Sequence, residues 1–232
     1  DIPTLDVGMS YLQVSVGSLH TILLRSDGNV VACGSNDEGQ CDIPSLDEGM
    51  SYTQVSAGDL NSVLLRSDGC AVACGDNQYG QTDFPPLEDE TSYVQVSAGT
   101  FHTVLLRSDG SVVACGPNGQ GQCDIPTLDE GMSYTQVSAG DDHTLLLRSD
   151  GNVVACGGNL SGQCNVPSLE PGASYISDAA HDRTVAIQLD LDCCADAFTL
   201  VCSSLSGEEK LRLNARGSDL AWETHKRLVL KR

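Results

Sequence analysis

The sequence repeats a 15-residue segment almost letter for letter, first at 20–34 and again at 61–75, 102–116 and 143–157, with a period of 41 residues. Each copy contains two apolar runs joined by Asp-Gly, as at Asp27-Gly28, and this dipeptide readily supplies the positive φ angles of a tight type I′ turn. We therefore expect each copy to form a β-hairpin. Four hairpins at one strict spacing indicate a repeat protein, in which one supersecondary unit is used several times.

The repeated unit contains three expected strands, at 11–16, 20–25 and 30–33 in the first copy, followed by a glycine-flanked loop and a proline-containing connector. Residues 1–9 match 124–132 at all but one position, so they read as the end of a preceding repeat. We expect a β-propeller domain at 1–192 and a separate tail at 193–232. The complete units are 10–50, 51–91, 92–132 and 133–173, and a degenerate fifth follows at 174–192.

The second expected strand of each unit is apolar at consecutive positions, such as Ile22, Leu23 and Leu24, rather than at alternating ones. Successive side chains of a strand point to opposite faces, so both faces of this strand must be covered. Small sheets packed face to face around an axis achieve this, and three or four short strands in about 40 residues are typical of a propeller blade. No unit holds an 11-residue stretch with helical apolar spacing, which excludes a helical solenoid. The predicted fold class is all-β, a propeller or partial propeller arc of about five blades with a short β-β-α tail.

The balance of charge also changes at residue 192, the expected domain boundary. The formal net charge is -20, with 27 acidic against 5 basic side chains in 1–192 and 5 against 7 in 193–232. A strongly acidic arc repels nucleic acid and anionic membrane surfaces, which are bound through Lys and Arg. No apolar run approaches the length that spans a bilayer, so we expect no direct membrane insertion. We expect a protein partner with a basic surface.

The string at 98–110, AGTFHTVLLRSDG, followed by VVACGPNGQGQ at 112–122, resembles the repeat of the regulator of chromosome condensation (RCC1-like) family. The resemblance covers 1–192 and implies a β-propeller, usually seven-bladed in that family and used as a protein-binding platform. Cysteine stands where the family usually has an aromatic residue, and no inserted wedge loop is present, so guanine-nucleotide exchange is not implied. The light sensing of a plant member needs clustered tryptophans, whereas this chain has Trp222 alone.

The tail admits two interpretations. Residues 197–207 read as a strand and turn, 210–215 alternate, and Ser218-Asp219 can cap a short helix through Leu228. This order resembles the opening strand-turn-strand-helix of a ubiquitin-like domain, with 205–207 as the turn and 220–229 as the helix start. In the other interpretation, 198–203 is a closing strand that pairs with the N-terminal segment.

The polar residues that recur from repeat to repeat are the candidates for metal binding or catalysis. His20, His102 and His143 share one repeat position with Asn61 and could form a metal-binding ring, but we expect them to pack at strand starts, with no metal. Arginines at 25, 66, 107 and 148 should pair with nearby carboxylates. No nucleophile-base-acid set occurs once only. We therefore predict no enzymatic activity, no catalytic residue and no cofactor.

The eleven cysteines follow the repeat spacing, which favours reduced thiols buried as small apolar residues and an intracellular reducing compartment (cytosol, nucleus or organelle). A pair between Cys33 and Cys41 stays open. Cys70 with Cys74, and 193 with 194, break the pattern and are the expected reactive thiols.

Binding is expected where the copies differ, because scaffold positions are fixed while loops vary. Neutral drift in loops is the alternative explanation. Phe101, Tyr79 and Leu160 are the expected apolar anchors in an acidic setting. The full candidate set is Leu19, Asp37, Glu38, Asp59, Leu60, Gln78, Tyr79, Thr100, Phe101, Asp141, Asp142 and Leu160.

Three functions are consistent with these patterns. The first is a non-enzymatic scaffold that binds another protein through the loops of an acidic propeller. The second is a structural or accessory subunit of a large assembly, such as an organellar membrane complex, in which neighbours complete the array. The third is an adaptor in ubiquitin signalling, which depends on the tail alone.

Overall fold

A computed structural model describes residues 2–87 and 90–167 with their side chains, and the backbone of five strands between 186 and 230. The chain divides into two compact units, Asp1–Ile176 and Ser177–Arg232. In the described ranges every regular element is a β-strand, and no helix is long and apolar enough to cross a membrane. The expected domain boundary at 192 stays a prediction.

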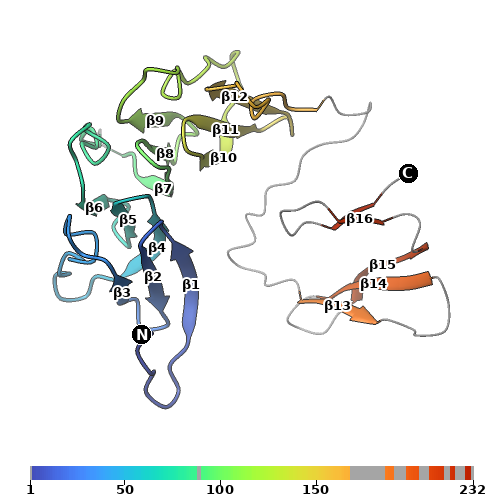
Figure 1. Cartoon of the computed structure of the whole chain (residues 1–232), viewed down its shortest axis with the longest axis horizontal. Helices are drawn as coiled ribbons and strands as arrows, with labels where there is room; N and C mark the ends of the chain where they lie inside the picture. The colour runs from blue at the N-terminus through green and yellow to red at the C-terminus, as the bar shows by residue number, and fades with distance from the viewer. Residues whose placement is uncertain are drawn as a thin grey trace. The chain divides into compact units, whose positions relative to one another are not determined.

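The first unit consists of four three-stranded antiparallel sheets, one for each repeat, which follow one another in chain order (Figure 1). The strands start and end within one residue of the bounds expected for the first repeat, which confirms four blades of an all-β propeller. The sheets are β1 (Tyr11–Val16), β2 (His20–Arg25) and β3 (Val30–Gly34); β4 (Tyr52–Ala57), β5 (Asn61–Arg66) and β6 (Ala71–Gly75); β7 (Tyr93–Ala98), β8 (Thr103–Arg107) and β9 (Val112–Cys115); and β10 (Tyr134–Ala139), β11 (His143–Arg148) and β12 (Val153–Gly157).

The apolar core lies between consecutive blades. Ile22 and Leu24 of β2 pack against Tyr52 and Val55 of β4, and this cluster also includes Leu64 of β5. The residues on either side of position 64 belong instead to the next cluster, with β7. Consecutive residues of a central strand therefore cover opposite faces, as the sequence predicted. At roughly 1.5 to 3 kcal/mol for each fully buried aliphatic side chain, these interfaces hold the blades together.

Side-chain hydrogen bonds join the first strand of each blade, here called the inner strand, to the inner strand of the next blade. Gln13 Oε1 accepts from the backbone N–H of Val55 at 2.9 Å, and Ser15 Oγ accepts from that of Ala57 at 2.8 Å. Inner strands are the edges of their sheets, so these bonds satisfy amides that have no further strand beside them. The same bonds recur at 2.9 Å between Gln54 and Val96, Ser56 and Ala98, Gln95 and Val137, and Ser97 and Ala139.

The hairpin turn differs from the expected type I′ geometry. Gly28 has a positive φ of 79°, but Asp27 does not, since Glu90 is the one non-glycine residue with a positive φ among those described. The Asp27 carboxylate instead accepts from the backbone N–H of Asn29 at 3.1 Å and pairs with Arg25 at 2.9 Å. With Arg25 N also bonded to Asn29 O, the result is typical of a three-residue loop with a left-handed glycine. Aspartate here anchors the turn through its side chain.

Each hairpin turn and connector is fastened to the start of the next blade. The backbone N–H of Tyr52 donates to Gly28 O at 2.8 Å, and the Tyr52 hydroxyl donates to Pro44 O at 2.7 Å. Equivalent hydroxyl bonds run from tyrosines 11, 93 and 134 to prolines 3, 85 and 126. The tyrosine that opens each repeat therefore fixes the path of the connector that precedes it.

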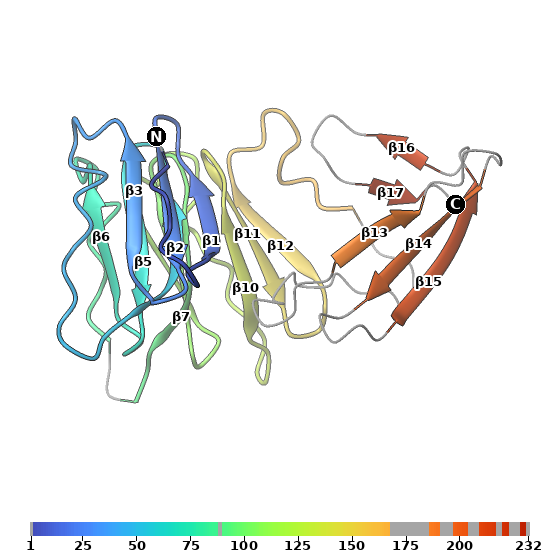
Figure 2. The same cartoon turned by 90° about the horizontal axis from the view of Figure 1, so that it is seen from below.

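The second unit contains two further sheets. β14 (Ala197–Ser203) lies between β13 (Ala186–Asp190) and β15 (Glu209–Arg216), as Figure 2 shows, and β16 (Leu220–Trp222) pairs with β17 (Leu228–Leu230). The β14–β15 pair confirms the two expected strands, and the expected turn at 205–207 between them lies outside the described residues. The rest of the degenerate fifth repeat lies outside the described residues.

Two expectations for this unit are wrong. The predicted helix at 218–228 is wrong, because Leu220–Trp222 within it forms β16 and pairs with Leu228–Leu230, and such pairing overrides a local capping signal. The closing-strand interpretation of 198–203 also fails. Both edges of β14 are occupied by β13 and β15, so no edge is left to pair with the N-terminal segment.

Candidate protein-binding surface

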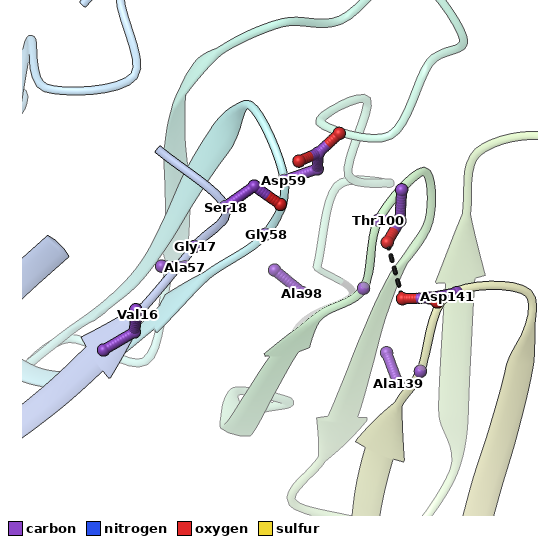
Figure 3. A pocket seen from close by; sticks show the side chains of 12 residues that line it. Val16, Gly17, Ser18, Ala57, Gly58, Asp59, Ala98, Thr100, Ala139 and Asp141 are labelled. Carbon is purple, nitrogen blue, oxygen red and sulfur yellow. Dashed lines mark hydrogen bonds between the residues drawn. The ribbon is translucent and has the colours of Figure 1, made fainter. Parts of the chain in front are cut away.

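A pocket of about 300 Å³ opens at the ends of the inner strands, where the chain turns from the first to the second strand of each blade (Figure 3). Every blade contributes the same three positions, a small apolar residue, a glycine and a variable residue. We call this the axial pocket. Its lining is Val16, Gly17 and Ser18; Ala57, Gly58 and Asp59; Ala98, Gly99 and Thr100; and Ala139, Gly140 and Asp141.

The side chains of the axial pocket carry oxygen atoms and negative charge. Asp59 and Asp141 supply carboxylates, and Ser18 and Thr100 supply hydroxyls. Thr100 Oγ1 donates to Asp141 Oδ1 at 2.8 Å, which ties the third blade to the fourth across the pocket rim. The charged groups that line the pocket are both acidic, so the pocket favours a cation.

Gly17 and Gly99 of the axial pocket are required because a histidine ring of the same blade and a backbone oxygen of the next blade lie against each of them. A Cβ on Gly17 would approach Cε1 of the His20 ring to 2.6 Å and would collide with the backbone oxygen of Gly58. A Cβ on Gly99 would lie 3.0 Å from the His102 ring and collide with the Gly140 oxygen. Only glycine therefore allows neighbouring inner strands to approach this closely over a buried ring.

Two of the three repeated histidines, His20 and His102, bond to the next blade. His20 Nε2 lies 2.9 Å from Ser62 Oγ, and His102 Nε2 lies 2.8 Å from Thr144 Oγ1. Each hydroxyl donates its own proton to a backbone oxygen, that of Gln40 or Gln122, so each ring must carry its proton on Nε2. No group of three or more His, Cys, Asp or Glu residues that could hold a metal occurs in the described part of the chain.

Burial determines the protonation of these rings. His102 is 1% exposed, and this desolvation lowers its pKa to about 4, with a further lowering from His143 and an opposing effect of Asp142. Burial also lowers the pKa of His20, against the opposing charge of Asp59. Both rings are neutral at pH 7. They serve as fixed hydrogen-bond donors between blades.

The residues predicted from sequence variation lie in two loop families, which we call the inner loops and the outer loops. The inner loops follow the inner strands, and three of their candidates, Asp59, Thr100 and Asp141, line the axial pocket. The other inner-loop candidates, each one residue further along, are Leu19, Leu60, Phe101 and Asp142. The outer-loop candidates follow the third strand of a blade and are Asp37, Glu38, Gln78, Tyr79 and Leu160.

The two loop families meet at one point. The Tyr79 ring, on an outer loop of the second blade, packs edge-on against the Phe101 ring on an inner loop of the third, with centroids 5.9 Å apart and planes at 82°. Tyr79 is 56% and Phe101 44% exposed. Such an aromatic pair offers an apolar contact at the edge of an acidic surface. Leu160 is 99% exposed and Leu19 62%, and neither joins this pair.

The outer loops are held by their repeated residues. Asn36 donates through Nδ2 to Asp42 at 2.8 Å and accepts through Oδ1 from the backbone of Cys41 at 2.7 Å. The buried Gln40 accepts from the backbone N–H of Glu38 at 3.0 Å. These hydrogen bonds leave the side chains of Asp37 and Glu38 exposed at the loop tip, so the residue types there can vary without disturbing the loop.

Sequence reasoning missed the repeated part of the pocket. The glycines at 17, 58, 99 and 140 and the small residues before them were not predicted as binding residues. Their signal was the recurrence of glycine at the end of a strand, which indicates a close backbone approach. Ser18 was part of a varying pair but was not chosen as a candidate.

Seven of the eight cysteines in the described ranges are half-buried, where the sequence predicted full burial. Eight described cysteines are free, and Cys70 is the exposed one among them, so the open Cys33–Cys41 pair is not a disulfide. Burial raises the pKa of Cys74 to about 11, which removes Cys74 from the expected reactive thiols. Cysteines 193 and 194 lie outside the described residues.

The arginines behave largely as expected. Arg25, Arg66 and Arg148 each pair with the aspartate two residues later, at 2.7 to 2.9 Å. The charge of Arg107 contributes to a lowered pKa of Asp109, after the larger effect of hydrogen bonds from Ser111. These half-exposed pairs stabilise turns and leave few cations on the arc.

Four equivalent blades, joined edge to edge by side-chain hydrogen bonds and carrying variable loops at one end, define a repeat protein of the β-propeller class. The sequence model of the Regulator of chromosome condensation (RCC1) repeat matches residues 12–40, 52–81, 93–122 and 134–163, one match for each blade and about half of the chain. The chain belongs to this family.

Solved structures with a similar fold support the same assignment. Yeast RCC1 (Prp20) bound to Kap60 superposes with a TM-score of 0.60 at 18% identity over 79% of this chain and 52% of that one. Prp20p from Saccharomyces cerevisiae gives 0.56 at 23% identity over 82% and 56%. Human WBSCR16 gives 0.57 at 17% identity over 86% and 62%. The chain thus spans between about half and three-fifths of the proteins it matches, and these identities establish the fold alone.

A comparison with curated protein sequences found no significant match. None of the similarities reported above supports the ubiquitin-like interpretation of the tail, because the family matches end at residue 163 and the structures are RCC1-type folds.

Proposed function

We propose that this chain is a non-enzymatic scaffold that binds a protein with a basic surface through the loops around the axial pocket. The observation that carries the proposal is the pocket itself. Inner loops of four blades converge on it, and its charged lining groups are Asp59 and Asp141. Phe101 of the exposed Tyr79–Phe101 pair follows Thr100 on one of these inner loops. Acidic groups with an adjoining aromatic pair suit the side chain of lysine or arginine.

The charge of the whole arc supports this choice of partner. Residues 1–192 carry 27 acidic against 5 basic side chains, and three of the arginines are engaged in pairs of their own. A field of one sign speeds the encounter with an oppositely charged protein and orients it. We expect association to weaken steeply as salt concentration rises.

Two of the similar structures concern proteins that bind other proteins. One shows yeast RCC1 (Prp20) bound to Kap60, and the other was described together with its binding to Gsp1p and histones. These partners belong to those proteins. They support protein binding as the general role of a propeller of this family.

The test measures binding of the 232-residue chain to a panel of lysine- and arginine-rich peptides, with acidic peptides of equal length as a reference. Asp59→Asn with Asp141→Asn should weaken binding of the basic peptides about tenfold or more, equivalent to at least 1.4 kcal/mol. The matched control is Asp47→Asn with Asp129→Asn, which removes the same charge from exposed connectors. An equal loss of affinity in both double variants would mean that net charge alone explains the effect. That result would refute the assignment of the site to the axial pocket.

The aromatic pair has its own test. Phe101→Ala with Tyr79→Ala should weaken binding while the melting temperature changes little, because both side chains are about half exposed. The matched control is Val94→Ala, which removes a comparably exposed apolar side chain from an inner strand rather than from the loops. Unchanged binding in the aromatic double variant would show that the loops at 79 and 101 do not contact the partner.

A further inference from the structure

The interface between the second and third blades, here called the second interface, lacks a buried hydrogen bond that its two neighbours have. In those neighbours a histidine bonds to a hydroxyl of the next blade, at 2.8 to 2.9 Å. The residues at the same positions of the second interface are Asn61 and Thr103. They are 2% and 0% exposed, yet neither Asn61 Nδ2 nor Thr103 Oγ1 has a hydrogen-bond partner among the described residues.

The shorter side chain of asparagine explains the missing bond. Asn61 Oδ1 lies against Gly58, in the same way as the His20 ring lies against Gly17, so both side chains start beneath an inner-loop glycine. Asparagine lacks the outer atoms of the imidazole ring. Its amide nitrogen therefore stops short of the hydroxyl that Nε2 of a histidine reaches, and Thr103 loses that partner.

Thr103 also lacks the second bond of its equivalents. In the neighbouring interfaces the hydroxyl donates to the backbone oxygen of Gln40 or Gln122, at 2.7 and 2.8 Å. The residue at that position in the second interface is Gln81, and Thr103 Oγ1 does not bond to it. A polar group that is buried without a partner is costly, and this interface holds two.

We propose that one buried water molecule binds in the second interface and joins the second blade to the third. The water accepts from Asn61 Nδ2, bonds to Thr103 Oγ1 and donates to the backbone oxygen of Gln81. Three hydrogen bonds to otherwise unpaired groups are typical of buried water in proteins. A water molecule is small enough to take the place of the imidazole atoms that asparagine lacks.

The chemistry of these three groups selects a neutral ligand that both donates and accepts. A cation cannot accept from the amide of Asn61, and an anion is repelled by the backbone oxygen of Gln81. A buried ion would also need a charged partner to offset its loss of solvation. No group of three or more His, Cys, Asp or Glu residues that could supply one to a metal occurs in the ranges that the structure describes.

The water also connects to the exposed surface through Gln81. Gln81 Oε1 accepts from the backbone N–H of Tyr79 at 3.0 Å, and Gln81 Nε2 donates to Asp76 at 2.9 Å. The water therefore ties the residue that holds this outer loop of the second blade to β8 of the third. The Tyr79–Phe101 pair joins the same two blades at the surface.

The first test is a pair of high-resolution crystal structures, of the wild type and of Asn61→His. The wild type should show a water at about 2.7 to 3.2 Å from both Asn61 Nδ2 and Thr103 Oγ1. In Asn61→His the ring should displace this water and bond directly to Thr103 Oγ1, as in the two neighbouring interfaces. The melting temperature of the variant should not fall below that of the wild type, which verifies that it folds.

The second test detects the water in solution, by nuclear Overhauser effects between water and the methyl group of each threonine in the 232-residue chain. Thr103 should show the signal of a long-lived water. Thr144 is the matched control, because it is equally buried but bonds directly to His102 at 2.8 Å. Asn61→His should remove the signal at Thr103 and leave Thr144 unchanged.

Three results would overturn the proposal. The wild-type crystal structure could show Thr103 bonded directly to Asn61 or Gln81 with no water between them. The signal at Thr103 could persist in Asn61→His, or it could appear equally at Thr144, which would assign it to exchange of the hydroxyl proton. None of these results bears on the peptide-binding test of the axial pocket, which measures an exposed surface.

Discussion

The stability of this propeller should fall as the solution is acidified through the range in which free histidine takes up a proton. His102 is 1% exposed, and burial lowers its pKa to about 4. In the unfolded chain the same ring titrates near 6.5. Below pH 6.5 the unfolded state therefore binds a proton that the folded state rejects. Stability is fully present above pH 6.5 and is lost progressively as the pH falls toward 4.

The magnitude follows from those two values. The full difference corresponds to about 3 kcal/mol, of which about 2 kcal/mol is lost between pH 7 and pH 5. The replacement that isolates this effect is His102→Asn, because Asn61 already occupies the equivalent position of the second blade at 2% exposure. The variant cannot titrate there. The difference in unfolding free energy between wild type and variant should therefore narrow by about 2 kcal/mol over this pH range.

The assay is urea unfolding of both proteins at matched ionic strength at several pH values from 7 to 5. Carboxylates and the other histidines titrate in both proteins, so their contributions cancel in the difference. A second variant, Thr144→Val, removes the hydroxyl that lies 2.8 Å from His102 Nε2 but leaves the ring buried, so it should keep the pH dependence while lowering stability at pH 7. Parallel stability curves for wild type and His102→Asn would refute the reasoning.

Two further changes test how the blades are joined. Gln54→Ala should lower the unfolding free energy measured by urea unfolding by about 1 to 3 kcal/mol, because it leaves the buried N–H of Val96 without its acceptor, and an unchanged value would contradict the role of that bond. Gly28→Ala should lower the melting temperature more than Gly49→Ala. Both residues have a φ near +80°, but a methyl group on Gly28 also collides with the next blade, while one on Gly49 meets nothing. Equal decreases in melting temperature would contradict the importance of that contact.

The sequence was sufficient for the blades because their signals are local and repeated. Three consecutive apolar residues at 22–24 required two covered faces, and the 41-residue period required one unit to recur, which left few folds. The turn at Asp27-Gly28 was assigned the wrong geometry because the dipeptide permits more than one loop length. Contacts of Asp27 with Arg25 and Asn29 decide between them, and side-chain contacts of that kind cannot be counted from a dipeptide.

The axial pocket was beyond sequence reasoning for a different reason. Its lining positions are 41 residues apart, and nothing local states that Gly17, Gly58, Gly99 and Gly140 converge. The variable loops could be recognised by comparing copies, but the Tyr79–Phe101 contact joins an outer loop to the inner loop of the next blade. Whether two such loops are neighbours depends on the angle between blades. That angle is set by packing and by the hydrogen bonds from the next blade to the glutamine and serine of each inner strand.

These hydrogen bonds between blades also explain why the copies vary most at the loop tips. In a typical blade the inner-strand glutamine and serine bond to the next blade, the histidine or asparagine lies beneath the pocket glycine, and the tyrosine fastens the connector. A change at any of these positions disturbs two blades at once, because each residue belongs to an interface as well as to its own sheet. In the first repeat the side chains at 18–19 and 37–38 have no hydrogen-bond partner in another described blade, whereas among their equivalents Thr100 bonds to Asp141 and Phe101 packs on Tyr79. A chain built by repeating one unit can therefore acquire an asymmetric binding surface at these loop positions while the residues that join its blades stay the same.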